Sequence, residues 1–320
     1  MVTLCKEHNI DAIEMRKAYC NTLIEAGKKD QRIVSINCDL SSSMGTVPFA
    51  KEFPDRSFNM GIQEANACGV AAGMSATGLI PFFHSFAVFS SRRICDQIFQ
   101  SCAYARLNVK IIGGDAGVSA AINGGTHMAF EDVGILRVIP TVTILEPSDA
   151  VMMKCLVKQM AETYGVFYMR TLRKQVERIY EEGSEFKIGK AVVLREGKDV
   201  SIIASGMMVI EAIKAADILK SEGISARVVD MFTIKPIDAD CIKDCAAKTD
   251  AIVTAENHNI IGGLGSAVAE VLVENILVPM ERVGIQDRFG EVGTQNYLKE
   301  CFGLTAQHIC EKVKAVLKRK

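Results

Sequence analysis

Apolar positions in the first half of the chain follow two spacings. Short continuous apolar runs are typical of strands buried on both faces, and apolar residues every three to four positions are typical of amphipathic helices. These spacings predict strands at residues 32–39, 79–85, 108–114, 141–147 and 165–170, and helices at 11–27, 64–77 and 90–103. Ser148 or Asp149 is expected to cap the helix after the fourth strand. This alternation predicts a mainly parallel sheet that is covered by helices.

The pattern changes at Thr171. Residues 171–190 are charged and show little apolar periodicity, so we expect a connecting segment that runs over the surface. A second alternation follows, with strands predicted at 199–205, 225–231 and 250–256, and helices at 207–222, 237–246, 263–274 and 304–319. The sequence therefore predicts an α/β protein with a first domain at 1–170, a linker at 171–190 and a smaller second domain at 191–320.

The composition argues against several classes of protein, namely nucleic-acid-binding, membrane-associated, disulfide-rich and zinc-binding proteins. The chain has 320 residues, of which 23% are charged, and its formal net charge is −1. This balance gives no electrostatic reason to expect nucleic acid or a membrane surface as a partner, and no apolar run is long enough to span a bilayer. The 11 cysteines are scattered and contain no C-x-x-C pair. Such usage argues against a disulfide framework or a zinc site and favours the reducing cytoplasm.

One stretch contains an unexpected charge. In NMGIQEANACGVAAGMSATG, residues 59–78, nearly every position is small or apolar, yet Glu64 lies there without any basic residue. The simplest explanation is that the helix dipole favours a carboxylate in the first turn. The small residues also allow another backbone to approach closely, so we expect this helix to be buried, within the fold or at a subunit interface. An acid held in such a place is a candidate proton donor or acceptor.

The same region resembles a known family. MGIQEANACGVAAGMSATGLIPFFHSFAVFSSRRICDQI is similar to the pyrimidine-binding domain of transketolase, and LEPSDA, TIKPID and ENHNIIGGLGSAVAEVL resemble later segments of that family in the same order. The resemblance implies a thiamine diphosphate enzyme that transfers a two-carbon ketol unit. It also implies that Glu64 hydrogen-bonds a ring nitrogen of the cofactor's aminopyrimidine and promotes its imino tautomer. The counterpart of this carboxylate would then be a cofactor, so no lysine is needed beside it.

The resemblance assigns further residues to the cofactor and the reacting atoms. Phe89 is expected to stack on the aminopyrimidine with Phe86 beside it. His127, in NGGTHMAFED, is expected to face the substrate near the imino nitrogen as a proton shuttle. Gly124 and Gly125 would let the backbone approach the ligand. Without the resemblance, the phenylalanines would be ordinary core aromatics and the histidine a structural one.

Three more residues are expected to bind an anionic substrate tail. Arg16, Ser43 and Arg170 match family positions, and two arginines with a hydroxyl group suit an oxyanion. Taken singly, each arginine is also explained as a solvated side chain. The loop GDAGVSAAINGG departs from the family pattern, because Asp115 replaces a substrate-contacting histidine and Asn123 replaces an aspartate that contacts a donor hydroxyl. These changes predict a non-standard ketose as donor, such as a deoxy, branched or sulfonated derivative.

One half of the family's machinery is missing from the sequence. A complete transketolase has an N-terminal domain whose G-D-G…N motif holds magnesium and the diphosphate, and this sequence contains no Gly-Asp-Gly. We therefore expect the C-terminal subunit of a split transketolase, active only with a partner subunit, in a heterotetramer with two copies of each chain. No metal ligand is assigned to this chain, because the partner would hold most of the Mg²⁺ contacts.

Other assignments are open from the sequence. A 1-deoxyxylulose-phosphate synthase and the β-subunit of a 2-oxoacid dehydrogenase share the domain order. A non-catalytic regulatory paralogue would explain the unusual loop, but the presence of Glu64, Phe89 and His127 argues against it. A Rossmann dehydrogenase is disfavoured, because no G-x-G-x-x-G follows the first strand.

Overall fold

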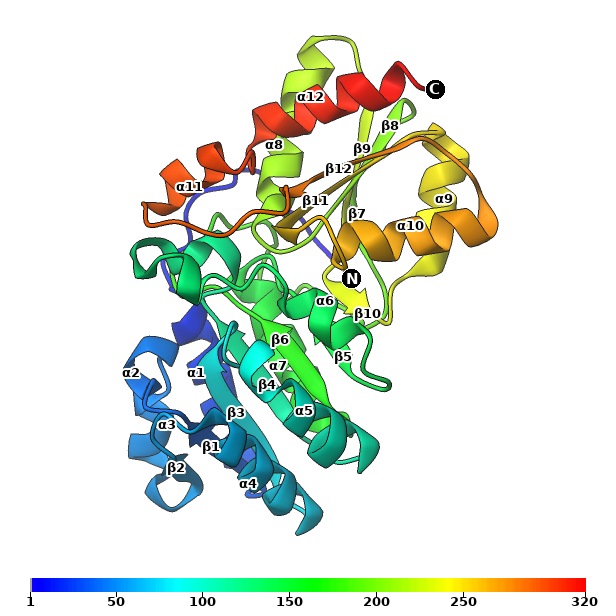
Figure 1. Cartoon of the computed structure of the whole chain (residues 1–320). Coiled ribbons are helices and arrows are strands. Elements are labelled where there is room, and N and C mark those ends of the chain that lie inside the picture. Colours follow the sequence, from blue (N-terminus) through cyan, green and yellow to red (C-terminus); the bar gives the residue numbers. More distant parts are fainter. Residues whose placement is uncertain (1) are drawn as a thin grey trace.

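Two β-sheets organise the chain, and helices lie on both sides of each (Figure 1). The first sheet is formed mainly by the first half of the sequence and the second sheet by the second half. The structure is a computed structural model that describes residues 2–320. This architecture confirms the predicted α/β class with two domains. Within residues 2–320, no helix combines the length and the apolar character needed to cross a membrane.

The first sheet has seven strands in the order β10-β5-β6-β4-β3-β1-β2. They are β1 (Ile33–Asn37), β2 (Ser57–Asn59), β3 (Ile80–Phe86), β4 (Lys110–Gly114), β5 (Thr143–Leu145), β6 (Phe167–Arg170) and β10 (Thr233–Lys235). All neighbours are parallel except β10, which pairs antiparallel with β5. The second half of the sequence thus contributes an edge strand to the first sheet. The apolar pattern did not predict β10, because three residues are too few to show a period.

Residues along the central strands alternate between two cores. Phe82 and Ile112 pack with α1 and α7, whereas Phe83 and Ile111 pack with α4 on the other side. Successive side chains of a strand point to opposite faces, so a continuous apolar run is what a doubly covered sheet requires. The helices of this part are α1 (Met15–Lys29), α2 (Ser41–Met44), α3 (Val47–Glu52), α4 (Glu64–Ala76), α5 (Cys95–Gln97), α6 (Asp132–Arg137) and α7 (Ala150–Glu162).

Short and irregular helices differ most from the sequence prediction. The single helix expected at 90–103 is divided into a 3₁₀ turn, η2 (Arg92–Ile94), then α5, then a π-helical segment, η3 (Ile98–Tyr104). Apolar spacing does not distinguish these helix types, because they share one buried face. The helices α2, α3 and α6 were not predicted, nor were the 3₁₀ turns η1 (Pro54–Arg56), η4 (Gly117–Asn123) and η5 (Gly125–His127).

The second sheet has five strands in the order β12-β11-β8-β9-β7, and β7 alone is antiparallel to its neighbour. Helices α8 and α12 cover one face, and α9 and α10 cover the other (Figure 1). The sequence predicted these four helices and the strands β8, β9 and β11, but it missed β7, β12 and α11. The elements are β7 (Val192–Arg195), β8 (Val200–Ala204), β9 (Ala226–Asp230), β11 (Ile252–Asn259), β12 (Met280–Ile285), α8 (Met208–Ser221), α9 (Ala239–Thr249), α10 (Leu264–Asn275), α11 (Gln295–Cys301) and α12 (Ala306–Leu317).

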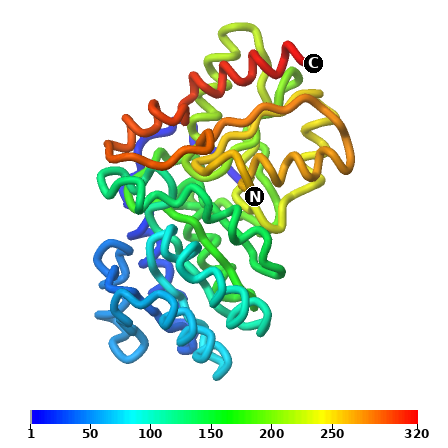
Figure 2. Tube along the Cα trace, in the orientation of Figure 1, coloured from blue at the N-terminus to red at the C-terminus, as the bar shows by residue number. Residues whose placement is uncertain are grey.

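The segment expected to run over the surface is instead partly buried between the domains. Tyr180 is fully buried and donates a hydrogen bond from its hydroxyl to Asp230 Oδ2 at 2.7 Å. Asp149, which caps α7, also accepts from the backbone nitrogens of residues 179 and 180. In Figure 2 the blue N-terminal segment runs toward the second domain, and its Leu4 forms an isolated β-bridge with Tyr180. The many charged residues of this segment interrupt its apolar pattern, so the sequence did not predict that one side of the segment is buried.

Candidate active site

The candidate residues of the first domain gather at the carboxyl edge of its sheet. Parallel strands end at the same edge, where open α/β sheets bind their ligands. Phe86 ends β3, Asp115 directly follows β4, and Arg170 ends β6. Phe89 lies in the loop after β3, and His127 lies in η5 after β4.

Glu64 begins α4 and is almost completely buried, with 2% of its surface exposed. Ser85 Oγ donates a hydrogen bond to Glu64 Oε1 at 3.0 Å, and Arg93 Nη1 donates to Glu64 Oε2 at 2.7 Å. The expectation that this carboxylate needs no cation of the chain is therefore wrong. Arg93 lies 29 positions further along the chain, on η2, so the stretch around Glu64 does not reveal it. The only sequence signal was the basic pair in SSRR, after β3.

The small-residue helix α4 is enclosed on one face only. Its residues Ala67, Cys68 and Ala71 are buried, whereas Gly69 and Gly73 on the other face have no atom within 4 Å of the place a Cβ would take. Within the single chain the helix is therefore buried on one face only, because nothing in residues 2–320 covers the outer face, and burial of that face at a subunit interface stays a prediction. That face carries no charged side chain, and its exposed residues are Ala65, Asn66, Gly69, Gly73 and Ala76.

An aromatic cluster lies beside Glu64. The ring centroids of Phe86 and Phe89 are 6.3 Å apart, and the His127 ring is edge-on to both, at 6.1 Å and 5.4 Å. The Arg93 guanidinium carbon lies 3.9 Å from the centroid of Phe89. Phe86 is nearly buried, but Phe89 and His127 are half-buried and reach the surface. The structure therefore brings together Glu64, Phe86, Phe89 and His127, which the sequence connected only by resemblance.

A loop of the second domain closes over the glycine-rich segment before His127. A Cβ on Gly125 would collide with the Gly290 carbonyl oxygen. Gly125 thus allows close approach to another part of the backbone, and the close approach to a ligand that we expect of this glycine stays a prediction. Gly124 has φ +81°, a conformation that glycine adopts without strain. Packing between the domains thus helps to fix the position of His127.

These side chains fit the aminopyrimidine of thiamine diphosphate. Glu64 is a buried acceptor, and Phe89 offers an aromatic face next to it. Arg93 shows that one flat group can make both contacts, because its guanidinium lies over Phe89 and donates to Glu64 at the same time. A flat nitrogen heterocycle with an N–H donor meets the same two contacts.

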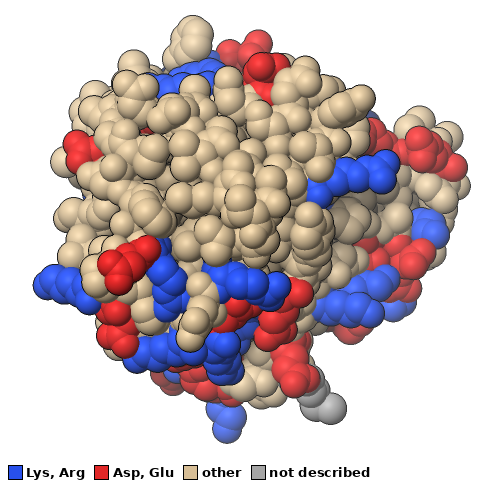
Figure 3. Space-filling model, turned by 90° about the horizontal axis from the view of Figure 1, so that it is seen from below, with Lys and Arg blue, Asp and Glu red and all other residues tan. Residues whose placement is uncertain are grey.

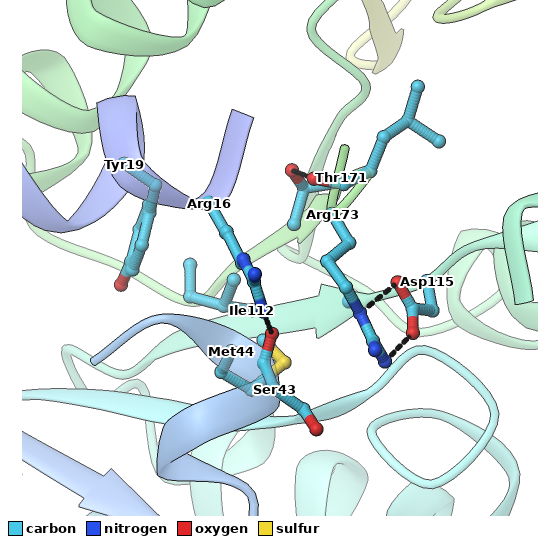
Figure 4. Close-up of a pocket in the computed structure, with 10 residues that line it drawn as sticks. Arg16, Tyr19, Ser43, Met44, Ile112, Asp115, Thr171 and Arg173 are labelled. Carbon is cyan, nitrogen blue, oxygen red and sulfur yellow. Dashed lines mark hydrogen bonds and ion pairs between the residues drawn. The ribbon is translucent and has the colours of Figure 1, made fainter. Parts of the chain in front are cut away.

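A small hollow opens between Arg16, Ser43, Asp115 and Arg173 (Figure 4). It borders the aromatic cluster, because the Arg173 guanidinium carbon lies 5.4 Å from the centroid of Phe86. Arg16 of α1 points across it toward α2 and donates from Nη1 to the carbonyl oxygens of Ser42 and Ser43, both at 3.2 Å. On the opposite side, Arg173 donates from Nε to Asp115 Oδ1 at 3.1 Å and from Nη2 to Asp115 Oδ2. The hollow thus holds two arginines and the hydroxyl-bearing Ser43, as the sequence predicted, but with a different second arginine.

Arg170 does not reach this hollow. It is fully buried, and it donates from Nε to Asp132 at 2.8 Å and from Nη1 to Glu146 at 2.6 Å. Its Nη2 donates to the carbonyl oxygens of Ala129 and Asn257. The expectation that Arg170 clamps a substrate anion is corrected on this ground, because its donors are used and it has no exposed surface. Burial disfavours the charged form of Arg170 and would by itself lower its pKa. The charges of Asp132 and Glu146 outweigh this effect and hold the pKa of Arg170 above its usual range.

The two unusual loop residues lie in different surroundings. Asp115 is buried, has φ +53°, and is bound by Arg173. Burial raises the pKa of the Asp115 carboxyl, and the Arg173 charge opposes that rise. Asn123 is exposed and lines an adjoining open hollow, to which Thr294 and Gln295 of the second domain also contribute. Asp115 lines the same hollow from its inner side.

A buried polar network joins the domains behind the site, and the sequence did not predict it. Glu256, on β11, accepts from the backbone nitrogens of Leu264 and Gly265 at the start of α10, at 2.6 Å and 2.8 Å. Burial raises the pKa of Glu256 to about 8 and lowers that of His258 to about 4.

Across residues 2–320, no group of three or more His, Cys, Asp or Glu side chains is placed to hold a metal ion.

Comparisons with known proteins match both halves of the chain. Residues 11–178 match the pyrimidine binding domain of transketolase, and residues 189–309 match the transketolase C-terminal domain. The chain is 49% identical over 306 residues to the 6-deoxy-6-sulfo-D-fructose transketolase subunit SqwH of Clostridium sp. (strain MSTE9), covering 96% of this chain and 95% of that protein. It is 36% identical over 308 residues to a subunit of the apulose-4-phosphate transketolase of Phocaeicola vulgatus, covering 96% and 98%.

A solved structure has the same arrangement. The split gene transketolase described as an inactive beta4 tetramer superposes with a TM-score of 0.90 and 45% sequence identity. The match covers 96% of this chain and 99% of that chain.

Proposed function

The chain belongs to the transketolase family, and we propose that it is the subunit of a split transketolase that binds the pyrimidine half of thiamine diphosphate. With its partner it would transfer a two-carbon ketol unit from a ketose to an aldehyde. The observation that carries this proposal is the assembly of Glu64, Phe89 and His127 at one place on the carboxyl edge of the sheet. A 1-deoxyxylulose-phosphate synthase or a 2-oxoacid dehydrogenase is less well supported, because the relatives described above carry transketolase names.

Each residue of the cluster has a proposed role toward the cofactor. Glu64 would accept a hydrogen bond from the aminopyrimidine and hold a proton at that ring nitrogen. Phe89 would stack on the ring, with Phe86 supporting it from the side. His127, edge-on to both rings, would move a proton at the substrate oxygen next to them. When bound, thiamine diphosphate supplies the carbanion chemistry by which carbon–carbon bonds break and form.

The hollow beside the cluster would bind the anionic tail of the sugar. Arg16 and Arg173 offer charge-assisted hydrogen bonds to a phosphate or a sulfonate, and Ser43 adds a hydroxyl group. We propose a non-standard ketose as donor, because Asp115 and Asn123 replace the family's histidine and aspartate. The names of the two relatives, one acting on a sulfonated and one on an apulose phosphate sugar, support this choice of donor class.

The partner would supply the remaining half of the site. We propose a separate subunit with a G-D-G…N motif that holds Mg²⁺ and the diphosphate, and an assembly of two copies of each chain. The uncharged outer face of α4 supports an extensive contact of this kind. Glu64 is the only Lys, Arg, Asp or Glu between residues 57 and 91. Figure 3, seen from the end where α4 and β2 lie, shows a wide area without charged side chains.

We also propose that the protein works in a reducing compartment such as the cytoplasm. All 11 cysteines are free, including Cys68 and Cys102, whose sulfur atoms lie 3.7 Å apart without a bond.

Reconstitution tests the proposed function. The chain alone should show no ketol transfer, and mixing it with a G-D-G…N partner, Mg²⁺ and thiamine diphosphate should restore activity. The donors to compare are 6-deoxy-6-sulfofructose, apulose 4-phosphate and xylulose 5-phosphate, and the last should be the poorest. Robust turnover by the isolated chain would contradict the split-subunit assignment. Preference for xylulose 5-phosphate would contradict the proposed donor class alone.

A further inference from the structure

Arg93 makes two contacts that the proposed reaction does not use. Its Nη1 donates to Glu64 Oε2 at 2.7 Å, and its guanidinium lies over the ring of Phe89 at 3.9 Å. The other Glu64 oxygen is bound by Ser85 Oγ. Because 42% of the Arg93 side chain is exposed and Glu64 is 2% exposed, Arg93 lies between Glu64 and the solvent. Arg93 therefore occupies the exposed side of Glu64 Oε2, and Ser85 binds the other oxygen from within the protein.

The two contacts are the same pair that an aminopyrimidine is expected to make. A guanidinium is flat, carries N–H donors in its plane and stacks on aromatic faces, so it satisfies a carboxylate and a phenyl ring together. Lysine would pair with Glu64 as a point charge but would offer no flat surface to Phe89. The choice of arginine at position 93 therefore matches the shape of the site as well as its charge.

We propose that Arg93 is an internal competitor of the cofactor: its side chain occupies the pyrimidine position in the isolated subunit and must leave before thiamine diphosphate binds. This inference rests on the proposed function. It adds that the affinity for the cofactor is set partly by a residue of this chain that opposes binding. When the competent form of a site is only a fraction of the total, the apparent dissociation constant rises in proportion.

The adjacent Arg92 is a matched control. It is the same residue type on the same short helix and is 53% exposed, but it pairs with Glu131 instead of Glu64. Removing Arg92 changes the local charge by the same amount and leaves the Glu64–Phe89 position unchanged. A difference between Arg92→Ala and Arg93→Ala therefore measures occupancy of the site and not net charge.

The test is calorimetric titration of thiamine diphosphate, with Mg²⁺, into the reconstituted complex, which measures binding without turnover. Arg93→Ala should bind about tenfold more tightly than wild type, Arg93→Lys should lie between them, and Arg92→Ala should equal wild type. In a Glu64→Gln background the benefit of Arg93→Ala should largely disappear, because the ion pair that holds Arg93 in place is lost. A thermal melt of each complex before titration identifies any variant that fails to fold. If Arg93→Ala fails to fold, the affinity of Arg93→Lys for thiamine diphosphate, compared with that of wild type, tests the proposal instead.

The outcomes separate the two proposals. If wild type binds thiamine diphosphate and Arg93→Ala binds equally or more weakly, Arg93 supports the bound cofactor and the inference is overturned while the proposed function stands. If neither wild type nor Arg93→Ala binds it in the presence of partner and Mg²⁺, the proposed function is overturned and the inference with it.

Discussion

Arg170 and Arg173 lie three positions apart in the same stretch, RTLR, yet they belong to different environments. Arg170 ends β6 and lies between two carboxylates without any exposed surface. Arg173 lies beyond the strand, 25% exposed, and reaches the hollow beside the aromatic cluster. The first arginine joins the two domains, and the second lines the hollow that we propose for the substrate anion. Residue type and order predicted an arginine at this hollow, but the turn after β6 decides which of the two lies there.

Removing Arg170 should have the largest effect on the free energy of unfolding. Arg170→Met leaves Asp132 and Glu146 buried without their cation, which typically costs about 3–5 kcal/mol. Urea unfolding of the isolated chain measures this loss. The triple variant Arg170→Met, Asp132→Asn, Glu146→Gln should recover much of it, because no unpaired charge is then buried. An unchanged midpoint in the single variant would mean that Arg170 does not join the domains.

Glu64→Gln should have the largest effect on turnover. Glutamine keeps the shape of the side chain but not its charge, so the proton at the pyrimidine nitrogen is no longer held. We expect at least about a hundredfold loss in kcat at saturating cofactor, the usual size for a positioned acid–base group. Ser85→Ala is the control, since it removes the other Glu64 contact but keeps the carboxylate. Near-normal rates in Glu64→Gln would make Glu64 an ordinary carboxylate of the first helical turn.

Arg173 should affect substrate binding rather than folding. Arg173→Ala removes a charge-assisted donor from the hollow, and such bonds contribute about 1.5–3 kcal/mol, or roughly one to two decades in KM for an anionic donor. The free energy of unfolding should change less than in Arg170→Met, because Arg173 is partly exposed and only one buried carboxylate, Asp115, loses its cation instead of two. Steady-state kinetics of the reconstituted complex provide the measurement. If Arg173→Ala leaves KM unchanged for sulfonated and phosphorylated donors alike, the anion does not bind in this hollow.

The sequence was informative where a function depends on residues close together in the chain or on a long apolar pattern. The central strands β1, β3, β4 and β6 and the helices α1, α4 and α7 were predicted because a buried run or a 3.6-residue period extends over many positions. The cluster of Phe86, Phe89 and His127 followed from the resemblance, and the structure brings these side chains together.

The missed features depend on contacts between distant parts of the chain. Arg93 pairs with Glu64 across 29 positions, β10 joins a sheet formed by the other half of the sequence, and Glu256 is satisfied by the first turn of α10. None of these pairings leaves a periodic signal, because each is decided by packing of the completed domains. A buried cation such as Arg170 is hidden from sequence for the same reason.

The smallest of the expected effects is a pH dependence of the free energy of unfolding, caused by Glu256 in the buried polar network behind the site. Burial raises the pKa of Glu256 from 4.5 to about 8, so the folded protein keeps a proton that the unfolded chain releases above about pH 4.5. The stability from this group is therefore complete below pH 4.5 and is lost as the pH rises toward 8. Glu256→Gln removes the titration but keeps an acceptor for the amides of α10, so it should flatten the fall in unfolding free energy between pH 6 and 8 by on the order of 1 kcal/mol.

The control for this titration is Glu281→Gln. Lys312 and Arg319 hold the pKa of Glu281 below its usual value against the effect of burial, so Glu281 is ionised throughout this range and its loss should leave the slope unchanged. Chemical unfolding of wild type and both variants at pH 6, 7 and 8 provides the comparison. Equal slopes in wild type and Glu256→Gln would mean that Glu256 is ionised at the junction. Glu256 would then add a third carboxylate to Asp132 and Glu146 around the single buried cation of Arg170.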